Sequence, residues 1–183
     1  LPEFTPWENP EFMGTGKAND FITSVVEDFI PAFESKYNVT QDKEARTITG
    51  ADVAGLFALY STLEYPNVFG SCGMFSPSIW YNKADLMSYL AQYTPKHTNT
   101  KFALTTAVQD MAAMQNDCSD VMVQLQQLGY TDMDQLRTAG MHDDKTWGSQ
   151  FPVVFKYLKG ISQDASLTDV QDRSIGVENR ATT

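Results

Sequence analysis

The sequence is poor in cysteine. Its two cysteines, Cys72 and Cys118, are too few for a disulfide framework and lie among apolar residues. They leave two alternatives, buried thiols or a single disulfide, and they exclude a cysteine-based metal cluster. We expect neither a metal nor another cofactor.

Basic residues and long apolar runs are also scarce. Lysine and arginine number 13 against 23 aspartates and glutamates, which gives a formal net charge of −10. A field of this sign repels nucleic-acid phosphates and anionic lipid. No run reaches the roughly 20 apolar residues of a membrane-spanning helix, and residues 1–10 lack the basic start and apolar core of a signal peptide. We therefore expect neither nucleic acid nor a membrane as a partner.

The chain does contain enough apolar material for a globular domain, with 42% hydrophobic and 12% aromatic residues. We expect one domain over residues 1–160, followed over residues 161–183 by a polar tail or linker in which Ser, Thr, Asp, Gln and Asn dominate. Residues 1–17 combine prolines and glycines with scattered aromatic side chains. This composition predicts a packed loop.

Strand and helix patterns alternate four times after residue 45. The predicted strands are 46–49, 70–75, 101–108 and 135–139, and the predicted helices are 19–33, 53–63, 85–93, 117–128 and 147–158. Pro31 predicts a kink or a helix of two parts, while Asn19 or Asp20, and Asp85, are the expected N-caps. The alternation predicts an α/β fold with a mostly parallel sheet flanked by helices, whose ligands bind beyond the carboxyl ends of the strands.

The predicted strand at 46–49 runs through small residues directly into the helix at 53–63. In an α/β-hydrolase this sharp turn carries the nucleophile, and small residues flank it because larger side chains would clash. Asp52 occupies that position here, between Gly50 and Gly55.

Five stretches, in the expected order, carry a family resemblance. They are residues 29–34, 46–50, 55–60 and 75–80, and Gly140-Met141-His142 with the following helix to Leu158. Over residues 19–159 the chain resembles the esterase branch of the α/β-hydrolases. This branch includes siderophore (enterochelin-type) esterases and carbohydrate esterases that act on feruloyl and acetyl groups. Residues 4–7 also resemble the family's loop after its fourth strand.

The resemblance implies catalytic roles for three residues besides Asp52. His142 matches the general base, and Asp110 matches the acid that orients it. The N–H of Val53 matches a donor to the oxyanion. Two further acids, Asp117 and Asp120, are rival candidates for the orienting role.

Asp52 leaves the function open between several interpretations. A carboxylate cannot become an alkoxide, so the serine mechanism of the resembled esterases does not follow. The first hypothesis is a catalytically inactive esterase-like module with a binding or scaffolding role, whose ligand is a small ester or a carbohydrate. The alternatives are an active or mutationally inactivated carboxylic-ester hydrolase acting on siderophore, feruloyl or acetyl esters, and an aspartate-nucleophile hydrolase of the kind that opens halides and epoxides.

The resemblance also implies a longer sheet than this chain supplies. About eight strands at roughly 30 residues for each strand and crossover need about 240 residues. We expect a partial α/β-hydrolase fold without its N-terminal strands, which either precede this sequence in a longer chain or come from a second chain. The family's second oxyanion donor belongs to that earlier segment. The resemblance further implies a bacterial, secreted or periplasmic protein.

Aromatic residues near the predicted site allow two interpretations. Phe75, Trp80 and Tyr81 either line a pocket for a sugar or aryl group or pack in the core. The other histidine, His97, is expected on a solvated loop.

Overall fold

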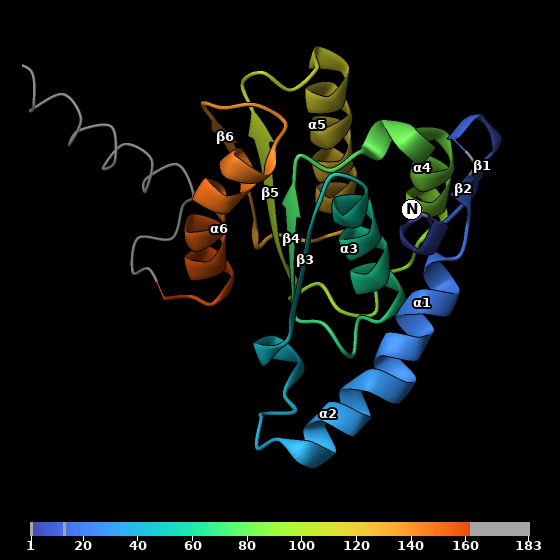
Figure 1. The fold of residues 1–183 in the computed structure, drawn as a ribbon, viewed down its shortest axis with the longest axis vertical. Coiled ribbons are helices and arrows are strands. Elements are labelled where there is room, and N and C mark those ends of the chain that lie inside the picture. The colour runs from blue at the N-terminus through green and yellow to red at the C-terminus, as the bar shows by residue number, and fades with distance from the viewer. Residues whose placement is uncertain (1, 13, 162–183) are drawn as a thin grey trace, which may run out of the picture.

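A computed structural model describes residues 2–12 and 14–161, and it has a central sheet with helices on both faces (Figure 1). The predicted tail at 161–183 lies outside the described residues except for Ile161. Among the described residues, no helix is both long and apolar enough to cross a membrane.

The sheet has four parallel strands in the order β3-β4-β5-β6. Their bounds are Thr47–Ala51 for β3, Ser71–Phe75 for β4, Lys101–Ala107 for β5 and Met133–Thr138 for β6. The four strands and their parallel direction confirm the predicted α/β class. Within the described residues, β3 and β6 form the two edges of this sheet.

One face of the sheet is covered by three helices, and the other by one. The first three are α3 (Val53–Glu64), α4 (Lys83–Gln92) and α5 (Ala112–Gln127). They share a core with strands β4 and β5 that includes Leu56, Met74, Leu86, Leu104 and Val121. On the opposite face α6 (Asp144–Leu158) packs Val154 and Leu158 against Phe75, Ala103 and Leu136.

The N-terminal helix is a rod in three segments (Figure 1). It consists of α1 (Ala18–Ser24), a π-helical turn (Val25–Phe29) and α2 (Ile30–Lys36). The interruption lies directly before Pro31, whose missing N–H removes a helical hydrogen bond. The prediction of a divided helix is confirmed. The prediction of its cap is wrong, because Asn19 and Asp20 lie inside α1 and no side chain caps it.

Residues 1–17 contain more structure than the predicted loop. Strand β1 (Glu8–Asn9) pairs antiparallel with β2 (Gly14–Thr15), and short 3₁₀ turns span Pro2–Phe4 and Pro10–Phe12. Trp7 packs edge-on against Tyr60 and Tyr89. The segment is packed as expected, but two-residue strands are too short to leave a periodic signal.

Three helices begin two or more residues earlier than predicted. Helix α4 begins at Lys83, α5 begins at Ala112 and α6 begins at Asp144. Asp85 therefore lies inside α4 and is not its N-cap, which corrects that prediction. The first turns of these helices are rich in polar or small side chains, so apolar periodicity detects only the part that faces the core. Further 3₁₀ turns span Lys43–Ala45 and Ile79–Asn82.

Candidate active site

Four loops meet at one edge of the sheet because all four strands run in the same direction. Asp52 follows β3, Ser76 follows β4, Asp110 follows β5 and His142 follows β6. The structure thus brings the predicted residues Asp52, Asp110 and His142 together, although they are far apart in the sequence.

Asp52 sits in a turn with an uncommon backbone conformation. Its φ is 56° and its ψ is −126°, a region that non-glycine residues rarely adopt and that costs about 1–3 kcal/mol. Hydrogen bonds hold the turn on both sides: the Asp52 N–H donates to the Phe75 carbonyl at 3.0 Å, and the Asp52 carbonyl accepts from the N–H of Ser78 at 3.0 Å. Neighbouring structure therefore fixes the backbone of Asp52, and the Ser78 hydroxyl, which donates to Oδ1, orients its carboxylate.

Gly50 and Gly55 let other parts of the chain approach closely around this turn. A Cβ on Gly50 would lie 2.0 Å from the Ala54 carbonyl oxygen, and one on Gly55 would lie 2.9 Å from Pro77 Cβ. Both distances are too short for a real side chain. Gly50 is therefore required by the close approach of β3 to the start of α3, and Gly55 by the close approach of α3 to the loop after β4.

The carboxylate of Asp110 is buried and fully hydrogen-bonded. Its Oδ1 lies 2.9 Å from Nδ1 of His142. Its Oδ2 accepts from Ser76 Oγ at 2.7 Å and from the Ala107 N–H at 2.6 Å. These bonds hold the charge in place and orient the imidazole.

The two rival candidates for the acid that orients His142 lie outside this site. Asp117 and Asp120 both pair with Lys83, at 2.6 Å and 2.7 Å. The two carboxylates raise the pKa of the Lys83 ammonium, chiefly through their hydrogen bonds to it. They form an ion-pair cluster on α5, and neither orients His142.

His142 lies between two carboxylates. Its Nε2 is 3.5 Å from Asp52 Oδ1, on the side opposite Asp110. Trp147 packs edge-on against the ring, with centroids 5.0 Å apart and planes at 89°. The loop that carries His142 is held to α6, since the Met141 N–H donates to Thr146 Oγ1 at 3.0 Å.

Two serines also contact these carboxylates, although residue patterns assign them no role in the site. Ser76 bonds Asp110, and the hydroxyl of Ser78 donates to Asp52 Oδ1. In the sequence, both serines lie in a Ser-Pro-Ser turn within the 75–80 stretch of the family resemblance, but neither matches a catalytic role. Ser76 has a φ of 41°, and this backbone conformation, which residue spacing does not reveal, directs the chain past both carboxylates.

Val53 is the first residue of α3. The N–H groups in the first turn of a helix have no acceptor within that helix. The Val53 N–H is therefore available in principle to an oxyanion, and its role stays a prediction.

A cavity of about 250 Å³ opens beside Asp52. Its lining residues are Asp52, Ser78, Trp80, Gln109, Asp110, Met111, Met114 and His142. Of the three aromatic residues considered from the sequence, only Trp80 lines it, while Phe75 and Tyr81 are buried. Among the described residues, no group of three His, Cys, Asp or Glu side chains is arranged to hold a metal ion.

His97 and the cysteines lie outside this site. His97 Nε2 is 2.6 Å from Asn67 Oδ1 on the surface, as expected for a solvated loop. Cys72 and Cys118 are buried free thiols, which decides between the two alternatives for the cysteines.

The sequence matches one protein family and one curated relative. The family model, described as "Putative esterase", matches residues 4–158. The relative is the "Uncharacterized protein YbbA" of Bacillus subtilis (strain 168), which is 30% identical over 100 residues. That match covers 52% of this chain and 40% of the relative.

Solved structures share the fold. Enterochelin esterase from Shigella flexneri aligns with a TM-score of 0.68 at 19% identity, over 76% of this chain and 37% of that one. The BES protein from Bacillus cereus aligns at 0.60 and 24% identity, over 80% of this chain and 60% of that one. A ferulic acid esterase aligns at 0.65 and 15% identity, over 77% of this chain and 61% of that one. The chain spans less than two thirds of each, so it has a partial α/β-hydrolase fold, as predicted.

Proposed function

This chain belongs to the esterase family of α/β-hydrolases, and from this premise we propose that it is a module that binds a small ligand beside Asp52 without hydrolysing carboxylic esters. The observation that carries the proposal is Asp52 itself. It lies on the positive-φ turn between β3 and α3, where the resembled esterases have their serine. We propose that this turn is the nucleophile elbow of the fold.

Acyl-transfer chemistry argues against Asp52 as an esterase nucleophile. Attack of its carboxylate on an ester would form a tetrahedral intermediate with two possible leaving groups, an alkoxide and the Asp52 carboxylate. The carboxylate is much the better leaving group, so the intermediate returns to the ester instead of forming a mixed anhydride. An aspartate side chain also lacks the hydroxyl from which the general base of the serine mechanism removes a proton.

The remaining groups support a second candidate, an esterase whose nucleophile has been altered. The buried Asp110 still holds Nδ1 of His142 at 2.9 Å, and Nε2 still faces the elbow position. This is the arrangement that a general base needs. With the Val53 N–H as one oxyanion donor, a hydroxyl at position 52 would restore the nucleophile, the base, the orienting acid and one of the two oxyanion donors.

The first experiment measures ester hydrolysis by the full chain. With p-nitrophenyl acetate and methyl ferulate we expect the rate in buffer alone, because position 52 lacks a hydroxyl. A rate well above buffer that disappears in His142→Ala would overturn the proposal.

The second experiment restores the nucleophile. We expect Asp52→Ser to hydrolyse p-nitrophenyl acetate at least about tenfold above background, since one catalytic group is worth 10²-fold or more. The gain should disappear in Asp52→Ser combined with His142→Ala. Asp52→Asn is the matched control: it removes the charge without adding a hydroxyl and should stay at background. No gain from Asp52→Ser would mean that Asp52 is not the sole obstacle to ester hydrolysis, and it would point to the second oxyanion donor or the N-terminal strands that the described residues lack.

A second chain that supplies further strands stays a prediction. Its support is strand β3, which among the described residues pairs on one side only, with β4. The other side presents backbone groups to which a further strand can bond.

A further inference from the structure

We propose that the cavity at Asp52 selects small ligands that carry a positively charged amine on an apolar body. The proposal rests on the proposed function, that this module binds a ligand at this site, and it names the chemical class of that ligand. Charge, an available acceptor atom and the cavity wall each support it.

The charge of the cavity is negative whatever the protonation state of His142. Asp52 and Asp110 are the two carboxylates of the lining, and His142 is its only basic residue. The formal charge is therefore −2 with a neutral imidazole and −1 with an imidazolium. The other lining residues are uncharged. A carboxylate ligand is repelled in either state, and an ammonium is attracted.

One oxygen of Asp52 is available to such a ligand. Oδ1 is bonded by the Ser78 hydroxyl and faces His142. Oδ2 has no hydrogen-bond partner among the residues that the structure describes, and the Asp52 side chain is 45% exposed. Because the turn holds the carboxylate in place, an ammonium donating to Oδ2 meets an acceptor that is already oriented.

The aromatic and apolar side chains in the wall of the cavity can contact both the cation and the apolar body of an amine ligand. Trp80 is 37% exposed and lines the cavity with Met111 and Met114. An indole face attracts a cation that is held above it, and methionine packs well against small apolar groups. The volume of about 250 Å³ lies below the roughly 300–1,000 Å³ of pockets for drug-sized ligands, so the ligand is small.

The site around position 52 thus has opposite electrostatic preferences in this chain and in the resembled esterases. An esterase site stabilises the negative charge that develops on the substrate oxygen. Here Asp52 adds a fixed negative charge at that place, which disfavours an oxyanion and favours a cation. An aspartate in place of the serine therefore changes the preferred charge of the bound group from negative to positive.

Three probes of the same shape test the charge preference. Benzylamine, benzyl alcohol and benzoate are titrated into the full chain at neutral pH, and binding is followed by calorimetry. We expect benzylamine to bind at least about tenfold more tightly than the other two. In Asp52→Asn, its affinity should fall at least tenfold, while that of benzyl alcohol should not change.

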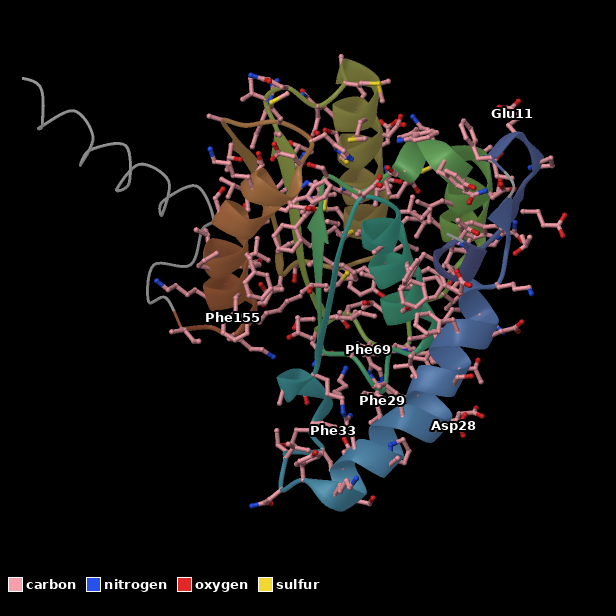
Figure 2. The ribbon with its side chains drawn as sticks, in the orientation of Figure 1. Glu11, Asp28, Phe29, Phe33, Phe69 and Phe155 are labelled. Carbon is pink, nitrogen blue, oxygen red and sulfur yellow. The ribbon has the colours of Figure 1, made fainter. Side chains whose placement is uncertain are left out.

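A matched control separates the site from the overall negative charge. Asp28 is exposed and projects from the N-terminal rod on the side facing away from the sheet (Figure 2). Asp28→Asn removes one charge outside the site and should leave benzylamine affinity unchanged. Trp80→Leu tests the wall and should weaken benzylamine several-fold even if Asp52→Asn fails to fold.

The outcomes distinguish this inference from the proposed function. It is overturned if benzylamine does not bind, if benzyl alcohol or benzoate binds as tightly, or if the tested Asp52 and Trp80 variants bind benzylamine unchanged. The proposed function fails through a different readout, the His142-dependent turnover of esters described above.

Discussion

At the scale of single residues, the conformation at Asp52 depends on neighbours that have almost no side chain. Gly50 allows β3 to meet α3, and Gly55 allows α3 to meet Pro77 in the loop after β4, at distances that a Cβ would not tolerate. The backbone of the turn is then fixed by hydrogen bonds to the loop after β4. Small residues at these positions support both the stability of the chain and the geometry of its site.

Gly50→Ala should therefore destabilise the fold. The new Cβ would lie 2.0 Å from a backbone oxygen that cannot move away without breaking the turn, so we expect a loss of about 3 kcal/mol. Gly148→Ala is the control, because a Cβ there meets nothing within 4 Å and the residue lies inside α6. It should stabilise by about 0.5–1 kcal/mol. Urea unfolding followed by circular dichroism measures both, and equal stabilities would contradict the steric argument.

Residue patterns identified part of the site. Asp52 and His142 lie in motifs, Asp110 follows a predicted strand in the expected chain order, and the structure brings the three together. Ser76 and Ser78 were missed because their contacts depend on the direction of the chain after β4. That direction follows from a single positive φ at Ser76, which leaves no periodic or compositional signal.

At the scale of elements, the start of α6 positions the histidine loop. Asp143 is the N-cap of α6 and accepts from the Thr146 N–H at 2.9 Å. This hydrogen bond lowers the pKa of the Asp143 carboxyl below its ordinary value of 3.8. The cap lies next to His142, so the same interaction that begins the helix also fixes the loop.

The acid dependence of stability tests this cap. Because the folded-state pKa of Asp143 is depressed, its stabilisation is present above the unfolded-state pKa and is lost as the pH falls through the folded-state value. Asp143→Asn keeps an acceptor oxygen but does not titrate. We expect its urea midpoint to match the parent chain near pH 7 and to fall less between about pH 5 and pH 2. Asp143→Ala should lower the midpoint already at neutral pH. Identical acid profiles for the parent and Asp143→Asn would contradict the assigned role.

The existence of the helices was predictable and so was the start of α3 at Val53, but the starts of α4, α5 and α6 were not. Apolar periodicity located α4 and α5, but Asp85 and Asp117 proved to lie inside them. A first turn that faces solvent follows no apolar pattern, and neither helix has a side-chain cap that would mark its start.

At the scale of the whole molecule, the alternation of strands and helices was sufficient to predict a parallel sheet. It was not sufficient to place the helices, since periodicity shows which side of a helix is apolar but not which face of the sheet that side covers. That α6 lies opposite α3, α4 and α5 became clear only from the packing of residues such as Val154 against Phe75.

The two buried thiols offer a probe of global unfolding. Cys72 on β4 and Cys118 on α5 are both fully buried, and burial raises the pKa of each thiol to about 12. Both should therefore stay protonated and unreactive toward a disulfide reagent such as DTNB at about pH 8. In concentrated urea both should react. Rapid labelling of one thiol in the native chain would show that part of the core opens separately from the rest.

The parallel sheet also has a consequence for how this chain folds. Every neighbouring pair among the four strands is joined by a crossover that contains a helix, so none of these pairs can form as a local hairpin. The entropy of closing each long loop is lost before any inter-strand hydrogen bond forms. Folding is then governed by non-local contacts, and we expect it to be slower than that of a helical bundle of the same length.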